Sequence, residues 1–274
     1  MAITAADISK LRTSTGAGML DCKKALTEAD GDFEKAVDIV RKKGLAIANK
    51  RADREATEGA VIAGVTADGK RGALIVLNCE TDFVAKNEGF VSLAKSFLDA
   101  ALEKNPANLE ELKALVVNGI TIGDKTIEQT AVIGEKVDLS FYQSLTAAQV
   151  VAYIHQGNRL STLVAFNQTV PEQVGRDVAM QVASMAPVAV SADGVDPELL
   201  AREKEVAKEL ARNEGKPENM LEKIAEGRIQ KFYKESTLLE QAFVKDNKKS
   251  IKQYLADTNK DLTATAFVRF SLTN

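Results

Sequence analysis

A β-hairpin pattern constrains the fold of this chain more than any other feature of its sequence. Two apolar segments, Val61–Val65 and Ala73–Leu77, flank the dipeptide Asp-Gly at 68–69, and this order is typical of two antiparallel strands joined by a tight turn. Asn87 then precedes apolar residues at helical spacing, which predicts a capped helix. Since this helix must cover one face of the hairpin, the pattern predicts an α+β fold.

A weaker version of the same pattern occurs later in the chain. The apolar segments Val150–Ile154 and Leu160–Phe166 flank a turn sequence at 156–158, and a helical pattern follows over 174–185. We interpret the two stretches as a duplicated antiparallel-sheet-plus-helix core. One more strand is predicted between them from the alternating apolar residues Val137, Leu139 and Phe141.

The first fifty residues predict a bundle of three short helices. Thr4 is a candidate N-cap, and glycine-containing breaks at 16–18 and 30–32 separate three segments with apolar residues at helical spacing. We expect the third helix to end at Arg41–Gly44, where cations and a glycine suit a helix C-terminus. A connector over 45–59 follows.

Two charged helices are predicted near the C-terminus, beginning at Asp196-Pro197, a cap followed by a first-turn proline. The apolar stripe predicted for the first helix comprises Leu199, Leu200, Val206, Ala207 and Leu210. Such thin stripes bury little surface, so we expect an antiparallel helical hairpin that protrudes and could pack on another copy. A short helix over 250–255 and a last strand over 265–270 complete the chain.

These patterns predict four structural units. They are a three-helix N-terminal domain over 1–50, a core subdomain over 51–145, a second core subdomain over 146–195 and 237–274, and the helical hairpin over 196–236.

Charge and composition exclude several classes of function. The 36 basic and 39 acidic residues are interspersed, which argues against the clustered cations of a nucleic-acid-binding face. The sequence lacks an apolar run of membrane-spanning length, so we expect no membrane partner. The two cysteines lie far apart, as is usual in a reducing compartment, and we expect a cytoplasmic protein.

Catalytic and cofactor sites are also disfavoured. The single histidine, His155, limits acid–base and metal chemistry, and Cys22 and Cys79 form no closely spaced ligand pair with it. Glycine-rich phosphate-binding motifs are lacking. We therefore expect neither a metal nor another cofactor.

The loop Asn78–Lys86 is the most informative segment for function. It leaves a strand that is expected to be buried and places Asp82 beside Phe83. One interpretation packs Phe83 into the local core and uses Asp82 for a turn or cap hydrogen bond. The other presents the Phe83 ring to a pocket on a partner protein, where full burial contributes about 1.5–3 kcal/mol.

Two segments resemble the sequence signatures of the bacterial elongation factor Ts family. Residues 11–26, LRTSTGAGMLDCKKAL, resemble the N-terminal signature, and residues 78–86, NCETDFVAK, resemble the second. Val76 stands where the family often has an acidic residue, a position peripheral to the Asp82–Phe83 pair. Outside these two segments the resemblance extends loosely over the whole chain.

This resemblance implies a fold, a partner and a set of contact residues. The N-terminal bundle would be ubiquitin-associated-like and would contact the GTPase elongation factor Tu. Asp82 and Phe83, with the flanking Thr81 and Val84, would enter that partner near its magnesium and nucleotide, and His155 would be a further contact. The positions implied at the contact made by the bundle are Arg12, Gly16, Met19, Leu20 and Lys23. We also expect one of Met19 and Leu20 to be a core residue of the bundle.

The function implied by the resemblance is that of a non-catalytic guanine-nucleotide exchange factor in translation elongation. Two alternatives come from other classes: a ubiquitin-associated-type adaptor that binds through residues 1–50 alone, and a small-molecule enzyme built on the duplicated core. Two assemblies also stay open, a homodimer and a two-plus-two complex with elongation factor Tu.

Overall fold

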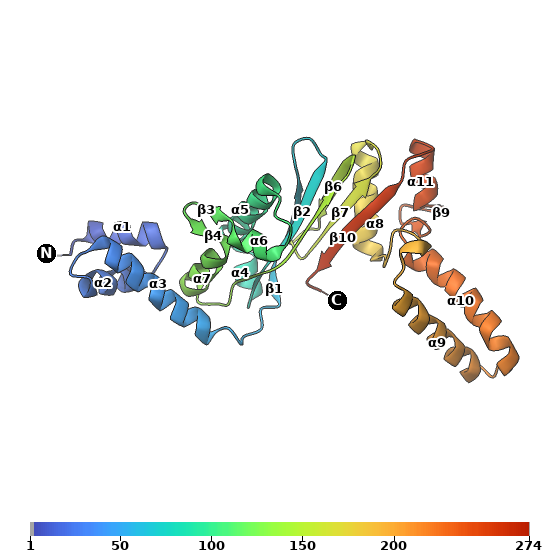
Figure 1. Ribbon diagram of the computed structural model, residues 1–274, viewed down its shortest axis with the longest axis horizontal. Coiled ribbons are helices and arrows are strands. Elements are labelled where there is room, and N and C mark those ends of the chain that lie inside the picture. The colour runs from blue at the N-terminus through green and yellow to red at the C-terminus, as the bar shows by residue number, and fades with distance from the viewer. Residues whose placement is uncertain (1–2, 274) are drawn as a thin grey trace.

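The computed structural model describes residues 3–273; Met1, Ala2 and Asn274, at the ends of the outermost predicted units, lie outside the described part. A helical bundle occupies one end of an elongated molecule, two three-stranded sheets lie in the middle, and a pair of helices projects from the other end (Figure 1). This mixture of helices and antiparallel sheets confirms the predicted α+β class.

The N-terminal bundle consists of α1 (Ala5–Thr15), α2 (Met19–Glu28) and α3 (Phe33–Lys50). Thr4 caps α1 in a reciprocal capping box with Asp7, and Asp32 caps α3. Both caps are local features that the sequence can encode without the rest of the fold. The fully buried centre of the bundle comprises Leu11, Cys22, Leu26 and Ala36.

The predicted end of α3 at Gly44 is wrong, because the helix continues to Lys50. Gly44 is buried, and a Cβ atom added to it would lie 3.3 Å from the Cβ of Ala131 in α7 (Ile122–Ile133). The glycine therefore allows two helices to approach closely, and it does not end the first of them. The connector is accordingly shorter than predicted and runs over 51–57.

The first sheet has the strand order β1-β2-β5, all antiparallel. β1 (Glu58–Val65) and β2 (Arg71–Cys79) form the predicted hairpin, and β5 (Asp138–Thr146) pairs with β2. The second sheet has the order β10-β7-β6, with β6 (Gln149–Ile154), β7 (Leu160–Phe166) and β10 (Ala264–Ser271). A helix follows each hairpin, α5 (Glu88–Lys104) after the first and α8 (Glu172–Met185) after the second.

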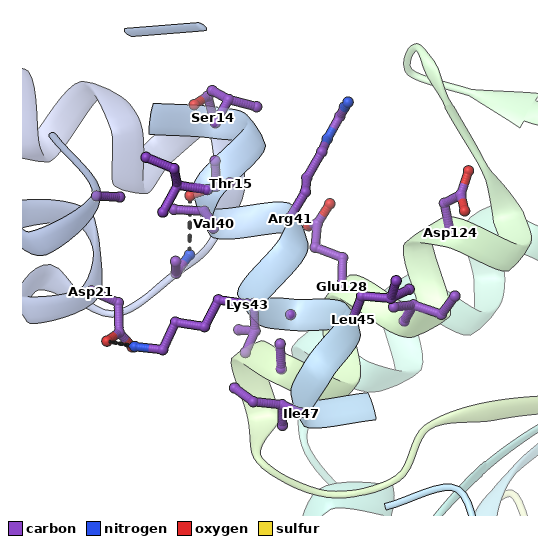
Figure 2. Close-up of a pocket in the computed structure, with 18 of the residues that line it drawn as sticks. Ser14, Thr15, Asp21, Val40, Arg41, Lys43, Leu45, Ile47, Asp124 and Glu128 are labelled. Carbon is purple, nitrogen blue, oxygen red and sulfur yellow. Dashed lines mark hydrogen bonds and ion pairs between the residues drawn. The ribbon is translucent and has the colours of Figure 1, made fainter. Parts of the chain in front are cut away.

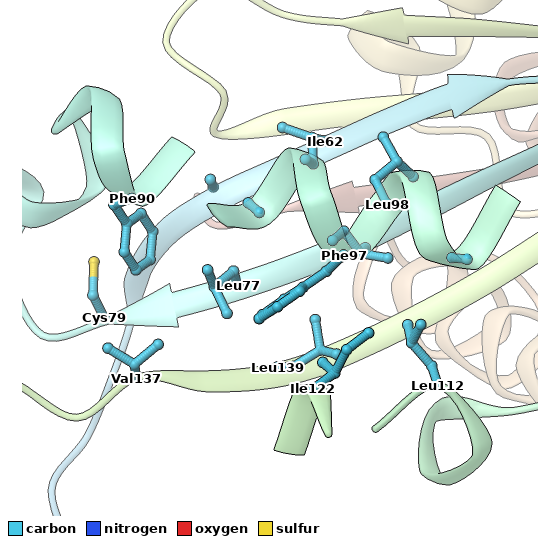
Figure 3. Packing of buried hydrophobic residues seen from close by; sticks show 14 of the residues in the cluster. Ile62, Leu77, Cys79, Phe90, Phe97, Leu98, Leu112, Ile122, Val137 and Leu139 are labelled. Atoms are coloured by element: carbon cyan, nitrogen blue, oxygen red, sulfur yellow. The ribbon is translucent and has the colours of Figure 1, made fainter. Parts of the chain in front are cut away.

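Successive side chains along each strand point to opposite faces of the sheet, and both faces of each sheet are buried. Ile75 and Leu77 belong to the core beneath α5, in which Figure 3 shows Leu77, whereas Leu74 and Val76 pack against the second sheet. In that second sheet, Leu163 points back to the first sheet and the neighbouring Val164 packs with α8. The result is four layers in the order helix, sheet, sheet, helix, which explains why β2 and β7 are apolar on both sides.

Residues 107–136 lie in the predicted core subdomain over 51–145 but show no clear helix or strand pattern in the sequence, yet they form two helices and a small hairpin. These are α6 (Leu109–Ala114), β3 (Val116–Val117), β4 (Ile120–Thr121) and α7. Leu112 and Ile122 are fully buried in the core beneath α5. α7 packs against α3 on its other side, so this segment joins the bundle to the core.

The helices α9 (Pro197–Asn213) and α10 (Leu221–Ser236) lie side by side and project from the body of the molecule (Figure 1). Val206 and Leu210, assigned to the apolar stripe of α9 from the sequence, are instead 46% and 49% exposed. Ala207 of the predicted stripe is buried, and small side chains let the two helices approach closely along a seam that comprises Ala207, Ala211, Leu221, Ala225 and Ile229.

The remaining elements are short. They are α4 (Asp82–Ala85), the 3-10 turns at Ala192–Gly194 and Glu218–Met220, β8 (Ala242–Phe243), β9 (Asp246–Ser250) and α11 (Ile251–Thr258).

Candidate functional site

Phe83 is the most exposed large hydrophobic residue in the described part of the chain, with 83% of its surface accessible. It lies on α4, a single helical turn between β2 and α5. The neighbouring Ala85 is buried and Val84 packs against the core beneath α5. The interpretation that Phe83 packs into its own core is therefore wrong, because Val84 and Ala85 anchor the turn and leave the ring outside.

The base of this turn is held by a residue from a distant part of the chain. Glu135, directly after α7, accepts hydrogen bonds through Oε2 from the backbone N–H groups of Glu80 at 3.1 Å and of Thr81 at 3.0 Å. Its Oε1 accepts a third from the hydroxyl of Thr81 at 2.7 Å. Thr81 in turn caps α4 by accepting from the backbone N–H of Val84 at 3.4 Å.

A second network ties the loop to the connector that follows α3. The Glu80 carboxylate accepts a hydrogen bond from the backbone N–H of Lys136 at 2.6 Å and one from the Arg51 guanidinium at 2.8 Å. These interactions lower the pKa of Glu80. The Lys136 ammonium donates to the carbonyl groups of Ala52 at 2.7 Å and of Arg54 at 3.0 Å. The connector is therefore bound both to Glu80 of the loop and to Lys136, which itself donates to Glu80.

Asp82 carries the negative charge beside the exposed ring. Its carboxylate pairs with the Lys86 ammonium at 2.6 Å, and this hydrogen bond lowers the pKa of Asp82. The Lys86 side chain is 73% exposed and that of Asp82 is 44% exposed. Asp82 is thus ionised at neutral pH, and water or another protein can replace Lys86 as its hydrogen-bond donor.

Cys79 lies directly below the loop and is unsuited to nucleophilic chemistry. Its side chain is buried, and its thiol donates a hydrogen bond to the carbonyl of Thr81 at 3.2 Å. Burial, and to a smaller extent the negative charge of Glu135, raises the pKa of Cys79 to about 12. The reactive thiolate form is therefore scarce at neutral pH.

The positions expected at a contact of the N-terminal bundle all lie at its surface. They are Arg12, Gly16, Met19, Leu20 and Lys23. The expectation that one of Met19 and Leu20 belongs to the bundle core is wrong, since they are 46% and 74% exposed. Cys22 and Leu26 fill that core in their place. Gly16, at the end of α1 with a φ of 68°, also approaches Val132 of α7.

A groove of about 590 Å³ is lined by residues of the bundle, of the β3–β4 hairpin and of α7. Figure 2 shows Val40 and Ile47 of α3 along one side and Glu128 of α7 on the other, with an ion pair between Asp21 and Lys43 at the rim. Charges of both signs surround an apolar floor. No group of three metal-ligating side chains occurs within residues 3–273.

His155 lies in the exposed turn between β6 and β7. Its Nδ1 is 2.9 Å from the hydroxyl of Tyr153. The turn also contacts β1, because the carbonyl of Asn158 accepts a hydrogen bond from the N–H of Val61 at 2.7 Å and Arg159 forms an ion pair with Glu58. Glu58 is paired with Cys79 in the sheet, so the His155 turn lies at the same end of β1 as the Phe83 loop.

The structure thus places the sequence-derived residues in three groups. Thr81, Asp82, Phe83 and Val84 form one turn, the bundle positions surround the α1–α2 junction, and His155 stands on a separate hairpin. Glu135 and Lys136 were not predicted as site residues, because only the tertiary fold brings them to the loop. Within residues 3–273, the helices are all too short or too polar to span a membrane.

Comparison with known proteins shows which family the chain resembles. The family model described as "Elongation factor TS" matches residues 80–274. A protein named elongation factor Ts from Porphyromonas gingivalis is 50% identical over 273 residues, covering 99% of each chain. One of the same name from Cytophaga hutchinsonii is 53% identical over 98% of this chain and 99% of its own. Another from Trichlorobacter lovleyi is 46% identical over 99% and 93%.

Proposed function

Because the chain belongs to the elongation factor Ts family, we propose that it is a guanine-nucleotide exchange factor for elongation factor Tu. In this proposal it acts without covalent chemistry, promotes the release of GDP and stabilises the nucleotide-free partner. The observation that carries the proposal is the Phe83 ring, which is 83% exposed on a turn whose neighbouring residues are anchored.

Exchange of this kind requires a difference in affinity between two states of the partner. Coupling between two ligands is reciprocal, so the factor weakens GDP binding by the same ratio by which GDP weakens binding of the factor. A factor that bound the nucleotide-bound and nucleotide-free states of the partner equally would not shift the equilibrium between them, however tightly it bound. The Phe83 ring must therefore fit a pocket that is poorly formed while magnesium and GDP are in place.

The size of this effect can be bounded from the ring itself. Full burial of a phenylalanine side chain contributes about 1.5–3 kcal/mol, which corresponds to about tenfold to a hundredfold in an equilibrium constant. The free factor leaves nearly the whole ring in water, so most of this free energy is available on binding. Asp82 adds a negative charge beside the ring, close to where a magnesium ion would be displaced.

The other two groups of residues would supply affinity that does not depend on the nucleotide. Leu20 and Met19 present apolar surface at the start of α2, and His155 presents an imidazole on the hairpin that shares an end of β1 with the loop. We expect these contacts to keep the factor on its partner while the ring enters and leaves.

Stopped-flow release of a fluorescent GDP from purified elongation factor Tu tests the proposal. Phe83→Ala should slow the maximal rate of GDP release by about tenfold or more, and Asp82→Ala should have a smaller effect. Val206→Ala is a matched control, since it removes an exposed apolar side chain from the distant α9. An unchanged maximal rate for Phe83→Ala would remove the wedge from the mechanism.

The adaptor alternative makes the opposite prediction in the same full-length chain. If the chain is an adaptor that binds through the bundle alone, Leu20→Asp abolishes binding, Phe83→Ala leaves binding unchanged, and the unsubstituted chain does not speed GDP release. On the exchange proposal, Leu20→Asp raises the concentration of factor needed for half-maximal release, and Phe83→Ala lowers the maximal rate. Titration of both variants against the partner distinguishes the two functions.

A further inference from the structure

The turn that carries Phe83 cannot set its own geometry. α4 has only four residues, and a single helical turn is unstable in water without contacts from outside, because helix nucleation is unfavourable. Its N-cap, Thr81, uses the side-chain oxygen to accept from Val84 at 3.4 Å, a long hydrogen bond. Val84 and Ala85 anchor the inner side of the turn, and the direction in which the ring points depends in addition on what fixes Thr81.

Glu135 supplies this external contact. Its carboxylate accepts three hydrogen bonds from two consecutive residues, Glu80 and Thr81, at 3.1, 3.0 and 2.7 Å. Bonds to an ionised acceptor are stronger than neutral ones. The bond from the Thr81 hydroxyl also turns the oxygen lone pairs toward the N–H of Val84, so one carboxylate orients both the backbone before α4 and the cap of α4.

Glu135 is itself fixed from both sides. Gly134 ends α7 with a φ of 81°, a left-handed conformation that favours glycine. On the other side, the N–H of Val137 donates to the hydroxyl of Thr130 at 3.0 Å, within the buried part of α7. The carboxylate thus reaches the loop from a rigid part of the fold.

We infer that Glu135 is a positioning residue for Phe83: it fixes the turn that carries the ring without contacting the ring's partner. Its effect on exchange rests on the proposed function, whereas its effect on the ring is a property of the isolated protein. α7 also packs against α3, so one helix determines the positions of both the bundle and the ring.

The sequence contains no tryptophan, which gives a direct test of positioning. Phe83→Trp places a single fluorophore at the site, and time-resolved anisotropy reports how freely it moves on the nanosecond timescale. Adding Glu135→Ala should raise the fraction of anisotropy lost to fast local motion. Glu135→Gln should restore most of the original value, because the carboxamide oxygen still accepts from both backbone N–H groups.

Two further variants keep this test independent of folding. Thr81→Val removes the hydroxyl at nearly constant volume and should give an intermediate loss of anisotropy. Glu103→Ala removes a glutamate whose side chain is 70% exposed on α5 and should change nothing. Thermal unfolding of each variant shows whether the core is intact. Unchanged local motion in the Glu135→Ala variant would overturn the inference.

Exchange kinetics then show whether the two residues act together. Glu135→Ala should lower the maximal rate of GDP release by about tenfold, with the half-saturating concentration of factor nearly constant. The double variant with Phe83→Ala should be no slower than Phe83→Ala alone, since a positioning residue acts only through the ring. Additive losses would contradict the inference. A normal rate for Phe83→Ala, together with increased tryptophan motion in the Glu135→Ala background, would reject the wedge and leave the positioning role intact.

Discussion

Gly44 of α3 lies so close to Ala131 of α7 that a methyl group added to the glycine would be 3.3 Å from the alanine Cβ. This contact between the bundle and α7 is formed by two small residues far apart in the chain. The contact fixes where α3 points, and hence where the α1–α2 junction stands relative to the Phe83 loop.

We therefore predict that Gly44→Leu separates the two helices. The leucine side chain cannot occupy the space that Ala131 fills, so the bundle should move away and pivot on the connector. Small-angle scattering of the full-length variant should give a larger radius of gyration. Gly227→Ala is the matched control, because nothing lies within 4 Å of the added methyl group in α10. That variant should gain up to about 1 kcal/mol in stability. An unchanged radius for Gly44→Leu would contradict the prediction.

Lys136 should protect the connector from proteolysis. Its ammonium binds the carbonyl groups of Ala52 and Arg54 at 2.7 and 3.0 Å, and Lys136→Met keeps the aliphatic stem but removes both hydrogen bonds. Because trypsin cleaves mobile chain after arginine, we expect faster cleavage after Arg51 and Arg54 in the variant. Lys86→Met, which breaks only the pair with Asp82, should leave this rate unchanged. Equal rates in the Lys136 variant and the unsubstituted protein would show that the connector is held by other contacts.

Asp177 of α8 should make the packing between α8 and the segment 245–254 sensitive to acid. Burial raises the pKa of this carboxyl, but hydrogen bonds from Lys245, Tyr254 and Gln173 at 2.7–2.9 Å outweigh burial and lower it below its usual 3.8. A carboxyl with a lowered pKa stabilises the fold at pH values above about 3.8, and this stabilisation is lost as the pH falls through the folded-state value.

Urea unfolding of Asp177→Asn at several pH values checks this sign. The variant should be less stable than the unsubstituted protein by about 1–3 kcal/mol at pH 7. The difference in the free energy of unfolding between the two proteins should become smaller below pH 3.8, because the Asp177 carboxyl of the unsubstituted protein becomes protonated. Asp257→Asn, which breaks an exposed pair with Lys249, should change stability by less than about 1 kcal/mol. A gap that widens on acidification would show that Asp177 is not ionised in the folded protein.

Features with local causes were predictable from the sequence. The turn at Asp68-Gly69 and the helix cap at Asn87 occur as expected, because the same few residues provide both the signal and its structural cause. The exposure of Phe83 was not predictable in this way. An aromatic residue after an aspartate suits a core as well as a surface, and the choice depended on Val84 and Ala85 facing inward.

The differences at Gly44 and Glu135 share one cause, a partner distant in the chain. Gly44 has the sequence pattern of a helix end, and only the approach of Ala131 explains why the helix continues. Val206 and Leu210 were placed in a buried stripe, but the seam follows Ala207 and Ala211, which leaves the side chains of Val206 and Leu210 about half exposed. Glu135 gave no local signal, since its hydrogen-bond partners precede it by 54 and 55 residues.

The strand order of the second sheet has a consequence for synthesis of the chain. β7 pairs with β6 at once, but its other neighbour, β10, lies about 100 residues further on. The segment that contains α9 and α10 must therefore be synthesised before β10 can pair with the free edge of β7. The first sheet, in contrast, has all its strands once β5 has been synthesised. The first sheet can thus complete its strand pairing while the second sheet still presents an open strand edge, which is a template for mispairing.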